Sequence, residues 1–351
     1  MSETIFFHGP CSESDRNGIV ALESLAWGPV EPGSNEYFEW QYLKNPTGLV
    51  FISCAQEPEG MVVAHNALIP VPVLLRGRKI TVGFSVNAVT HPDYRRRGLS
   101  VKTAQCLLEQ ASKAGIDCII SMPNEMSHEL YRSKLNFTRL GVPWLLVRWI
   151  DPGVFLAQHN LSKTGKTVSA VIRFASNVIA KHPKKPVTVR RLTDLKGLAI
   201  EKLWEQTEFI AATDTEWLKW RYLDHPTRHY EFALVGEPEE PQALAVYQIL
   251  ELYKKALLME FFAIPEVTVE TIQGLMGYVT ESCRKAGCSA LWSLSTPRSR
   301  KAHMLRKSGF WLVPGNLSEK SVLMLKKNEA ISGNIRLADM DISFGGLINY
   351  E

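Results

Sequence analysis

The sequence contains two related copies of one segment. Residues 36–47, EYFEWQYLKNPT, and residues 216–227, EWLKWRYLDHPT, lie 180 positions apart and share six of twelve residues, including Trp40 and Trp220. The tripeptide Lys-Ala-Gly also recurs, at residues 113–115 and 285–287, each time before an apolar stretch. A period this long indicates duplication of a whole domain rather than a solenoid repeat.

A chain of 351 residues is also too long for one ordinary core, so two domains are expected on length alone. The expected division is a first domain at residues 1–150, a linker with a helix at 151–186, and a second domain at 187–351.

Apolar periodicity predicts the same order of elements in both halves. In the first half, the predicted helices are 15–27, 37–43, 99–114 and 125–135, and the predicted strands are 49–54, 61–69, 72–75, 79–89, 118–122 and 142–150. In the second half, the predicted strands are 231–235, 243–250, 256–262, 290–294 and 321–325, and the predicted helices are 269–286 and 298–307. The expected fold class is α/β (α+β): each domain is a mixed, mostly antiparallel sheet flanked by helices.

The composition excludes several classes of protein. Hydrophobic residues make up 45% and charged residues 22%, as in a soluble globular protein. The net charge of +4 suits an anionic ligand but is too low for a nucleic-acid binder. No apolar run reaches the roughly 18 residues of a membrane span, and the N-terminus lacks the features of a secretion signal. The six cysteines form no CxxC pair and no histidines cluster, which predicts reduced thiols, no metal site and a cytoplasmic location.

The linker contains an amphipathic stretch. Residues 168–180 place six apolar side chains on one helical face, with lysines and an arginine around it. This pattern fits either a helix lying on a membrane surface or a connecting helix with its basic side in water. We favour the connecting helix, because the apolar face lacks tryptophan.

A basic loop follows the strand predicted at 79–89. The chain turns at His91-Pro92, continues through three arginines to Gly98, and enters a helix at or near Ser100. Backbone N–H groups from Arg96 to Ser100 are then able to converge on one anion at the positive end of that helix. Glycine allows close approach of the backbone, and arginine adds hydrogen bonds to phosphate. The segment therefore predicts a pyrophosphate site.

Residues 15–150 resemble a GNAT-fold, acyl-CoA-dependent N-acyltransferase. In that family the phosphate loop reads Arg/Gln-x-x-Gly-x-Gly/Ala, and Arg95, Gly98 and Ser100 occupy the three defining positions. Serine replaces the usual Gly or Ala, although it still supplies an N–H and is able to cap the helix. The resemblance implies acyl-CoA as co-substrate and a cofactor site at Ala88, Val89, Arg95, Arg96, Arg97, Gly98, Leu99, Ser100 and Asn124.

The resemblance also implies roles around the thioester. The family's oxyanion donor is a backbone N–H on the strand before the loop, here near Val89. A tyrosine on the following helix often protonates the leaving thiolate, and Tyr131 is the candidate, with a packing role as the alternative. Asn124 either bonds the cofactor arm or caps a helix.

Candidates for a general base are fewer. Ser85 and Asn87 are expected on one face of their strand, but neither is a strong base. His65 on the neighbouring strand is a catalytic candidate, although a lone strand histidine is more often structural. Asp339 and Asp341 are the best carboxylates; the alternative is a solvated acidic tail.

The second half lacks the loop. Its matching strand ends in EFFAIPEV, residues 260–267, where Glu266 would repel phosphate. One acyl-CoA site per chain is expected, with the second domain on the acceptor side.

The duplicated motifs resemble tandem-GNAT proteins of bacterial surface-polysaccharide clusters, some of which acylate the amine of a nucleotide-linked deoxyamino sugar. This implies transfer of an acetyl or 3-hydroxybutyryl-like group to such a small-molecule acceptor. The alternatives are a GNAT acetyltransferase of a peptide, antibiotic or other small amine, a tRNA-dependent aminoacyl transferase, and a non-catalytic acyl-CoA-binding protein. The oligomeric state is left open.

Overall fold

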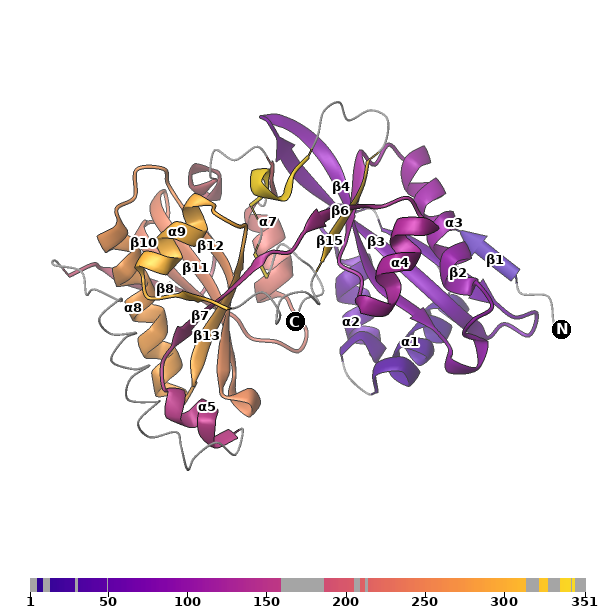
Figure 1. Cartoon of the computed structure of the whole chain (residues 1–351), viewed down its shortest axis with the longest axis horizontal. Coiled ribbons are helices and arrows are strands. Elements are labelled where there is room, and N and C mark those ends of the chain that lie inside the picture. Colours follow the sequence, from indigo (N-terminus) through magenta and orange to yellow (C-terminus); the bar gives the residue numbers. More distant parts are fainter. Residues whose placement is uncertain are drawn as a thin grey trace. The chain divides into compact units, whose positions relative to one another are not determined.

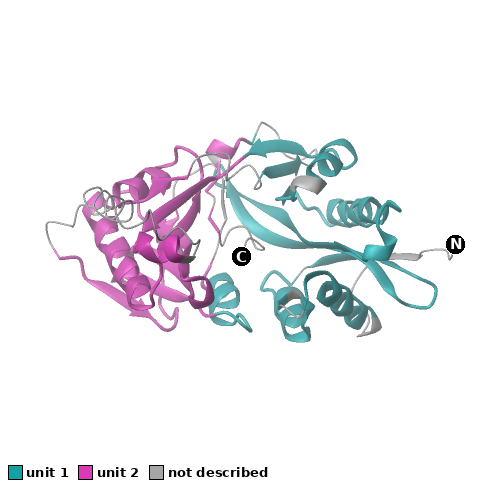
Figure 2. Ribbon diagram, turned by 60° about the horizontal axis from the view of Figure 1, so that its bottom comes forward, with its two compact units in different colours: residues 1–141, 216–228, 320–335 teal, residues 142–215, 229–319, 336–351 magenta. Residues whose placement is uncertain are grey.

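The computed structural model describes residues 5–8, 13–28, 31–48, 50–158, 186–204, 209–211, 214–313, 322–327, 335–341 and 343–344. The chain forms two compact units, drawn in different colours in Figure 2. Unit 1 comprises residues 1–141, 216–228 and 320–335, and unit 2 comprises residues 142–215, 229–319 and 336–351.

Unit 1 is built on a mixed sheet in the order β1-β2-β3-β4-β5-β15-β6 (Figure 1). Its strands are β1 (Ile5–His8), β2 (Phe51–Gln56), β3 (Val62–Leu75), β4 (Arg78–Thr90), β5 (Cys118–Ser121), β6 (Thr138–Gly141) and β15 (Leu323–Lys327). Its helices are α1 (Glu13–Trp27), α2 (Asn35–Phe38), α3 (Leu99–Lys113) and α4 (Glu125–Ser133), with 3₁₀ turns η1 (Glu31–Gly33) and η3 (Pro92–Tyr94). Only β4 and β5 are parallel neighbours along this path; the other pairs are antiparallel.

Unit 2 repeats this pattern in the order β14-β7-β13-β12-β11-β10-β8, with β12 and β13 as the parallel pair. Its strands are β7 (Trp144–Trp149), β8 (Val189–Leu192), β9 (Phe209–Ala211), β10 (Glu231–Glu237), β11 (Glu240–Leu250), β12 (Lys255–Ala263), β13 (Ala290–Ser295) and β14 (Trp311–Leu312). Its helices are α5 (Pro152–Gln158), α8 (Val269–Lys285) and α9 (Arg300–Lys307), with 3₁₀ turns η4 (Ile200–Leu203), η6 (Glu251–Tyr253) and η8 (Leu337–Asp339). The core of this unit lies between the sheet and α8, whose Ile272, Met276 and Val279 are fully buried.

Along the two strand orders given above, each sheet includes one strand from the other half of the sequence. In unit 1, β15 lies between β5 and β6, and in unit 2, β7 lies between β13 and β14. The compact units therefore do not follow the expected ranges 1–150 and 187–351. The apolar pattern of a buried strand predicts that the strand pairs, but it does not predict the sheet in which it pairs. The sheet that contains β7 and the sheet that contains β15 therefore cannot be assigned from the sequence.

The expected fold class is confirmed, and most predicted elements lie within a few residues of their predicted bounds. The short strands β6, β8 and β14 were not expected. The linker helix expected at residues 168–180 lies outside the described residues. None of the described helices is long and apolar enough to cross a bilayer.

The prediction of two strands at 61–69 and 72–75 is wrong, because β3 runs unbroken through Pro70 and Pro72. Proline has no N–H to give to a ladder and is tolerated at a strand edge. Both prolines lie beyond Leu68, the last residue of β3 that is paired with β2. The missing N–H groups therefore cost no hydrogen bond in the ladder between β2 and β3.

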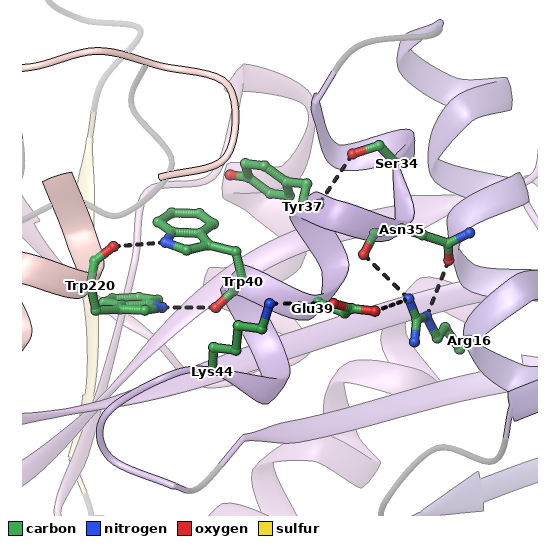
Figure 3. Close-up of polar contacts among 8 residues, drawn as sticks. All are labelled: Arg16, Ser34, Asn35, Tyr37, Glu39, Trp40, Lys44 and Trp220. Carbon is green, nitrogen blue, oxygen red and sulfur yellow. Dashed lines mark hydrogen bonds and ion pairs between the residues drawn. The ribbon is translucent and has the colours of Figure 1, made fainter. Parts of the chain in front are cut away.

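The repeated tryptophan motif forms a reciprocal contact inside unit 1. In each copy a short helix, α2 or α7 (Thr215–Leu218), continues into a π-helical turn, η2 (Glu39–Leu43) or η5 (Lys219–Leu223). The indole N–H of Trp40 donates to the carbonyl of Trp220 at 2.7 Å, and that of Trp220 donates to the carbonyl of Trp40 at 2.8 Å (Figure 3). The rings stack with centroids 5.0 Å apart. The two copies of the motif therefore bind each other through the same pair of groups.

Charged contacts fix α2 and η2 from both sides. Arg16 of α1 forms an ion pair with Glu39 at 2.7 Å and donates to the Asn35 side chain, while Lys44 lies 3.4 Å from Glu39 (Figure 3). On the other side, the Arg228 Nε donates to Glu31 at 2.8 Å. The π-turn is thus tied to α1, and the preceding turn η1 is tied to the segment that follows η5.

We predict that His225 makes unit 1 sensitive to acid. Its ring lies 4.2 Å from that of Trp40, and burial together with Arg221 and Arg228 lowers the pKa of His225 to about 3. In the unfolded chain the imidazole titrates near pH 6.5, so stability is complete above that pH and falls as the pH drops toward 3. The slope reaches about 1.4 kcal/mol per pH unit.

His225→Asn is expected to flatten this dependence, because Asn45 occupies the matching position of the first copy and its side chain accepts from the Thr47 N–H at 2.9 Å. Urea unfolding at pH 7.5 and pH 5 measures the change. The exposed His229→Asn is the control, and an unchanged slope in His225→Asn would contradict the assignment.

Candidate functional site

The parallel strands of unit 1 separate halfway along β4. Their pairing runs from Val82↔Cys118 to Phe84↔Ile120 and ends there, although β4 continues to Thr90. From Ser85 onward, β4 therefore presents backbone groups at an edge that β5 does not cover. Such groups need hydrogen-bond partners, and an extended ligand supplies them in the manner of an added strand.

A β-bulge interrupts β4 at this opening. His65 of β3 pairs with Val89 and Ala67 pairs with Val86, so Asn87 and Ala88 lie opposite a single residue. Neither is paired with β3 or β5, and Ala88 is exposed, whereas Val89 is buried and paired. Of the residues near Val89, where an oxyanion donor is expected, Ala88 is therefore the one that is exposed and outside both ladders. Bulges of this kind often re-aim the chain beside a functional site.

One face of the opening carries a narrow, mostly apolar pocket lined by β3, β4, β5, α3 and α4. The Tyr131 hydroxyl from α4 lies 3.2 Å from the Ser85 Oγ, and the Tyr131 ring packs on Phe137 with centroids 5.0 Å apart. Asn66 donates to the Thr103 hydroxyl at 3.1 Å, but its buried Oδ1 has no hydrogen-bond partner among the described residues. Tyr131 thus lines this pocket together with Ser85, and its predicted role as an acid stays a prediction.

The opposite face carries a buried polar network. Asn87 Nδ2 donates to Gln41 Oε1 at 2.8 Å and to the Tyr42 hydroxyl at 2.7 Å. The prediction that Ser85 and Asn87 share one face is therefore wrong. The extra residue at the bulge inverts the alternation of side chains, so Ser85 faces α4 while Asn87 faces η2.

His65 belongs to the same buried layer and not to the accessible opening. Its Nε2 lies 2.9 Å from Glu23 Oε1, and both side chains are almost completely inaccessible to solvent. Burial raises the pKa of Glu23, against the lowering effect of hydrogen bonds from His65 and Asn87. An acceptor amine bound at the surface does not reach this imidazole, so the geometry favours the structural alternative for His65.

The basic loop places its arginines in solvent ahead of α3. Arg95, Arg96 and Arg97 are exposed, and two residues of the loop are left-handed, Arg96 with φ 63° and Gly98 with φ 74°. The Arg97 guanidinium donates to the Asp93 carbonyl at 3.2 Å and lies 4.6 Å from the Tyr94 ring centre. Left-handed residues within such a turn direct successive N–H groups into one concavity.

The start of α3 completes this concavity. The helix begins at Leu99, with Gly98 as a left-handed N-cap that provides no side-chain hydrogen bond. Ser100 therefore lies within the first turn of α3. The expectation that Ser100 caps this helix is wrong. The N–H groups of this turn have no intrahelical acceptor, and helix starts of this kind are suited to binding an anion.

Asn124 caps a helix. Its Oδ1 accepts from the Ser127 N–H at 3.1 Å and from the Ser127 hydroxyl at 2.9 Å at the start of α4. The sequence left two roles open for Asn124, a bond to the cofactor arm or a helix cap, and in the structure Asn124 is the cap.

The C-terminal carboxylates have other surroundings. Asp341 accepts from Lys301 at 3.1 Å within unit 2, and both side chains are buried, which leaves this carboxylate ion-paired rather than poised as a base. Asp339 lies in η8, and its side chain is outside the described part of the structure. Within the described ranges, no three His, Cys, Asp or Glu side chains gather as metal ligands.

The matching position of unit 2 differs in one chemical respect. Strand β12 has the same bulge and separates from β13 after Leu258. At the start of α8, however, the Thr268 hydroxyl accepts from the Thr271 N–H at 3.2 Å, and Glu270 lies in the first turn. A capped, acidic helix start does not attract phosphate.

Comparison with protein families identifies the type of domain. Residues 10–134 match the family model described as an acetyltransferase (GNAT) domain. The chain carries a GNAT acetyltransferase domain. The match includes the basic loop, the open edge of β4 and Tyr131, and it confirms the expectation of an acyltransferase. None of the curated proteins matches the sequence.

Solved structures share the fold over nearly the whole chain. A conserved protein of unknown function and probable N-acyltransferase from Enterococcus faecalis V583 is 12% identical, with a TM-score of 0.65 over 93% of this chain and 73% of that one. A GCN5-related N-acetyltransferase from Anabaena variabilis ATCC 29413 is also 12% identical, with a TM-score of 0.63 over 92% and 73%. N-myristoyltransferase from Saccharomyces cerevisiae, solved with bound myristoyl-CoA, is 14% identical, with a TM-score of 0.59 over 93% and 78%.

Gln41, Tyr42 and Glu23 also lie beside the opening, and none of them was predicted from the sequence. Gln41 and Tyr42 belong to the repeated motif, so the repeat itself marks them as residues with a structural role. Glu23 gave no signal, since a single acidic residue on an amphipathic helix is ordinary.

We predict that the loop arginines determine the affinity for coenzyme A. Replacing Arg95 and Arg97 by Ala removes two exposed guanidinium groups beside the uncapped helix start. Because a hydrogen bond to a charged group contributes roughly 1.5–3 kcal/mol, we expect the calorimetric Kd to rise about tenfold or more. Arg306→Ala with Lys307→Ala, at the end of α9, makes the same change in net charge as a control. Equal affinity in the two double variants would remove the loop from the binding site.

Proposed function

We propose that this chain is an acyl-CoA-dependent N-acyltransferase with one active site, in unit 1, that acts on the amine of a small acceptor. One observation carries the proposal: the uncapped, basic start of α3 directly follows a strand whose edge is open and whose opening contains a tyrosine. In this proposal, the open end of β4 positions the thioester, and the loop and helix start that follow it in the chain bind the phosphates.

The proposed cofactor fits the groups that lack partners in unit 1. The pyrophosphate of coenzyme A requires several N–H donors and positive charge, which the turn from Arg96 to Val101 and its arginines supply. The pantetheine arm is an extended chain with two amides. Its N–H and C=O groups suit the open edge of β4, and one N–H suits the buried Asn66 Oδ1.

The reaction then requires a nucleophile, an oxyanion donor and an acid. The neutral amine attacks the thioester carbonyl carbon, and the developing oxyanion accepts from the Ala88 N–H at the bulge. The C–S bond then breaks, and the thiolate takes the Tyr131 hydroxyl proton, which Ser85 orients from 3.2 Å away. The amine nitrogen releases its extra proton to water, which also returns a proton to Tyr131.

The finer proposal concerns the acceptor. The sequence resemblance to sugar N-acyltransferases and the net charge of +4 support a nucleotide-linked deoxyamino sugar, which is an anion. The acyl group proposed with it is acetyl or 3-hydroxybutyryl-like. Other small amines, peptides and antibiotics remain the alternative acceptors.

Release of free thiol tests the function. The chain is incubated with acetyl-CoA or 3-hydroxybutyryl-CoA and, in turn, with nucleotide-linked amino sugars, free amino sugars, polyamines and short peptides. We expect turnover that depends on an amine and is highest with a nucleotide-linked amino sugar. Turnover with another amine alone would replace the acceptor, whereas tight acyl-CoA binding without turnover on any amine would favour a non-catalytic binding protein.

Tyr131→Phe separates chemistry from binding. The variant keeps the ring contact with Phe137 but loses the hydroxyl that faces Ser85. We expect kcat to fall by about 100-fold, the lower end of general acid catalysis, with little change in acyl-CoA affinity. Tyr278→Phe, a partly buried tyrosine of α8, is the matched control. An unaltered kcat in Tyr131→Phe would assign the thiolate proton to another donor.

A further inference from the structure

The bulge on β4 requires a residue in an unusual conformation. Asn87 has φ 49°, in the left-handed region that side chains other than glycine rarely adopt. Asparagine tolerates this region better than most residues, but the conformation persists only where the surroundings determine it. The surroundings of Asn87 are therefore informative.

The Asn87 side chain is held by the π-turn η2, which does not line the pocket. Its amide donates to Gln41 and Tyr42, at 2.8 and 2.7 Å, and the three side chains are buried. We call these two hydrogen bonds the Asn87 clamp. The amide also hydrogen-bonds Glu23, so its N–H groups face acceptors from both η2 and α1 in a dry environment, which fixes the side chain in one orientation.

The other end of the clamp is equally fixed. Gln41 and Tyr42 lie in the π-turn η2, directly after Trp40, whose indole and carbonyl are both bonded to Trp220. A π-turn places successive side chains differently from an α-helix and is often found at functional sites. Strand β4 is thus connected through η2 to the contact between the two repeated motifs, and Figure 3 shows the Trp40–Trp220 part of it.

We propose that Asn87 is a positioning residue: through its clamp to Gln41 and Tyr42 it holds the bulge so that the adjacent Ala88 amide points at the thioester carbonyl. This inference rests on the proposed function of the site. It assigns a catalytic purpose to the repeated motif, because η2 acts on the reacting strand from the face opposite the pocket.

The test uses the spectrum of the bound thioester, which does not require the acceptor. Acetyl-CoA labelled with ¹³C at the carbonyl is bound to the full chain, and its C=O stretch is recorded by difference infrared spectroscopy. A hydrogen bond from Ala88 lowers this frequency relative to acetyl-CoA in water. Asn87→Gly keeps the left-handed backbone accessible but removes the clamp, so we expect most of the shift to be lost while the Kd of acetyl-CoA changes less than threefold. With an amine substrate, kcat should fall about tenfold or more.

Two further variants make the test specific. Asn136→Gly is the same replacement at the other left-handed asparagine of unit 1, with φ 57°, and should leave the shift intact. Tyr42→Phe removes one acceptor of the clamp and should lose part of the shift, while Tyr42→Phe combined with Asn87→Gly should be no worse than Asn87→Gly alone.

The outcomes separate this inference from the function it rests on. If acetyl-CoA does not bind the wild-type chain, the proposed function fails. If it binds with a lowered C=O frequency that Asn87→Gly leaves unchanged, or if the effects of Tyr42→Phe and Asn87→Gly add, Asn87 does not position the amide through η2.

Discussion

The backbone of β4 has hydrogen-bonding groups that its own sheet does not use. Beyond Phe84 the strand has no partner in β5, and at Asn87 and Ala88 it leaves the ladder with β3 as well. Unpaired backbone groups beside a core are costly unless water or a ligand bonds them. The basic loop, the uncapped start of α3 and Tyr131 all lie around this one open edge, and each is useful only because the edge exists.

The comparison of the two copies shows which features belong to the fold and which belong to the site. Both have the parallel pair, the separation of its strands and the bulge. What differs is the start of the following helix, where Gly98 leaves the N–H groups of α3 available and Thr268 bonds one at α8. A few residues at the start of this helix thus change its capacity to bind an anion, without any change in architecture.

Much of this was predictable from the sequence because it depends on local signals. The elements follow apolar periodicity, and the position of the loop follows from Gly98 and its arginines. The inverted faces of Ser85 and Asn87 were not predictable, since a bulge at a non-glycine residue leaves no mark in the pattern of apolar residues. The contact between His65 and Glu23 was likewise not predictable, because nothing in the sequence links two residues that are 42 positions apart. Pairing between distant strands, as for β7 and β15, is the least accessible of all, because the two strands carry the same apolar signal.

The placement of β15 has a consequence for synthesis of the chain. When residues 1–141 have left the ribosome, the sheet that contains the open edge still lacks the strand between β5 and β6. That strand is made only after almost the whole second half, about 180 residues later at a few residues per second. Through this interval β5 and β6 expose unpaired edges, so the early intermediate is the form of the protein most in need of protection. The same arrangement means that deleting either half of the sequence removes a strand from the sheet built mainly by the other half.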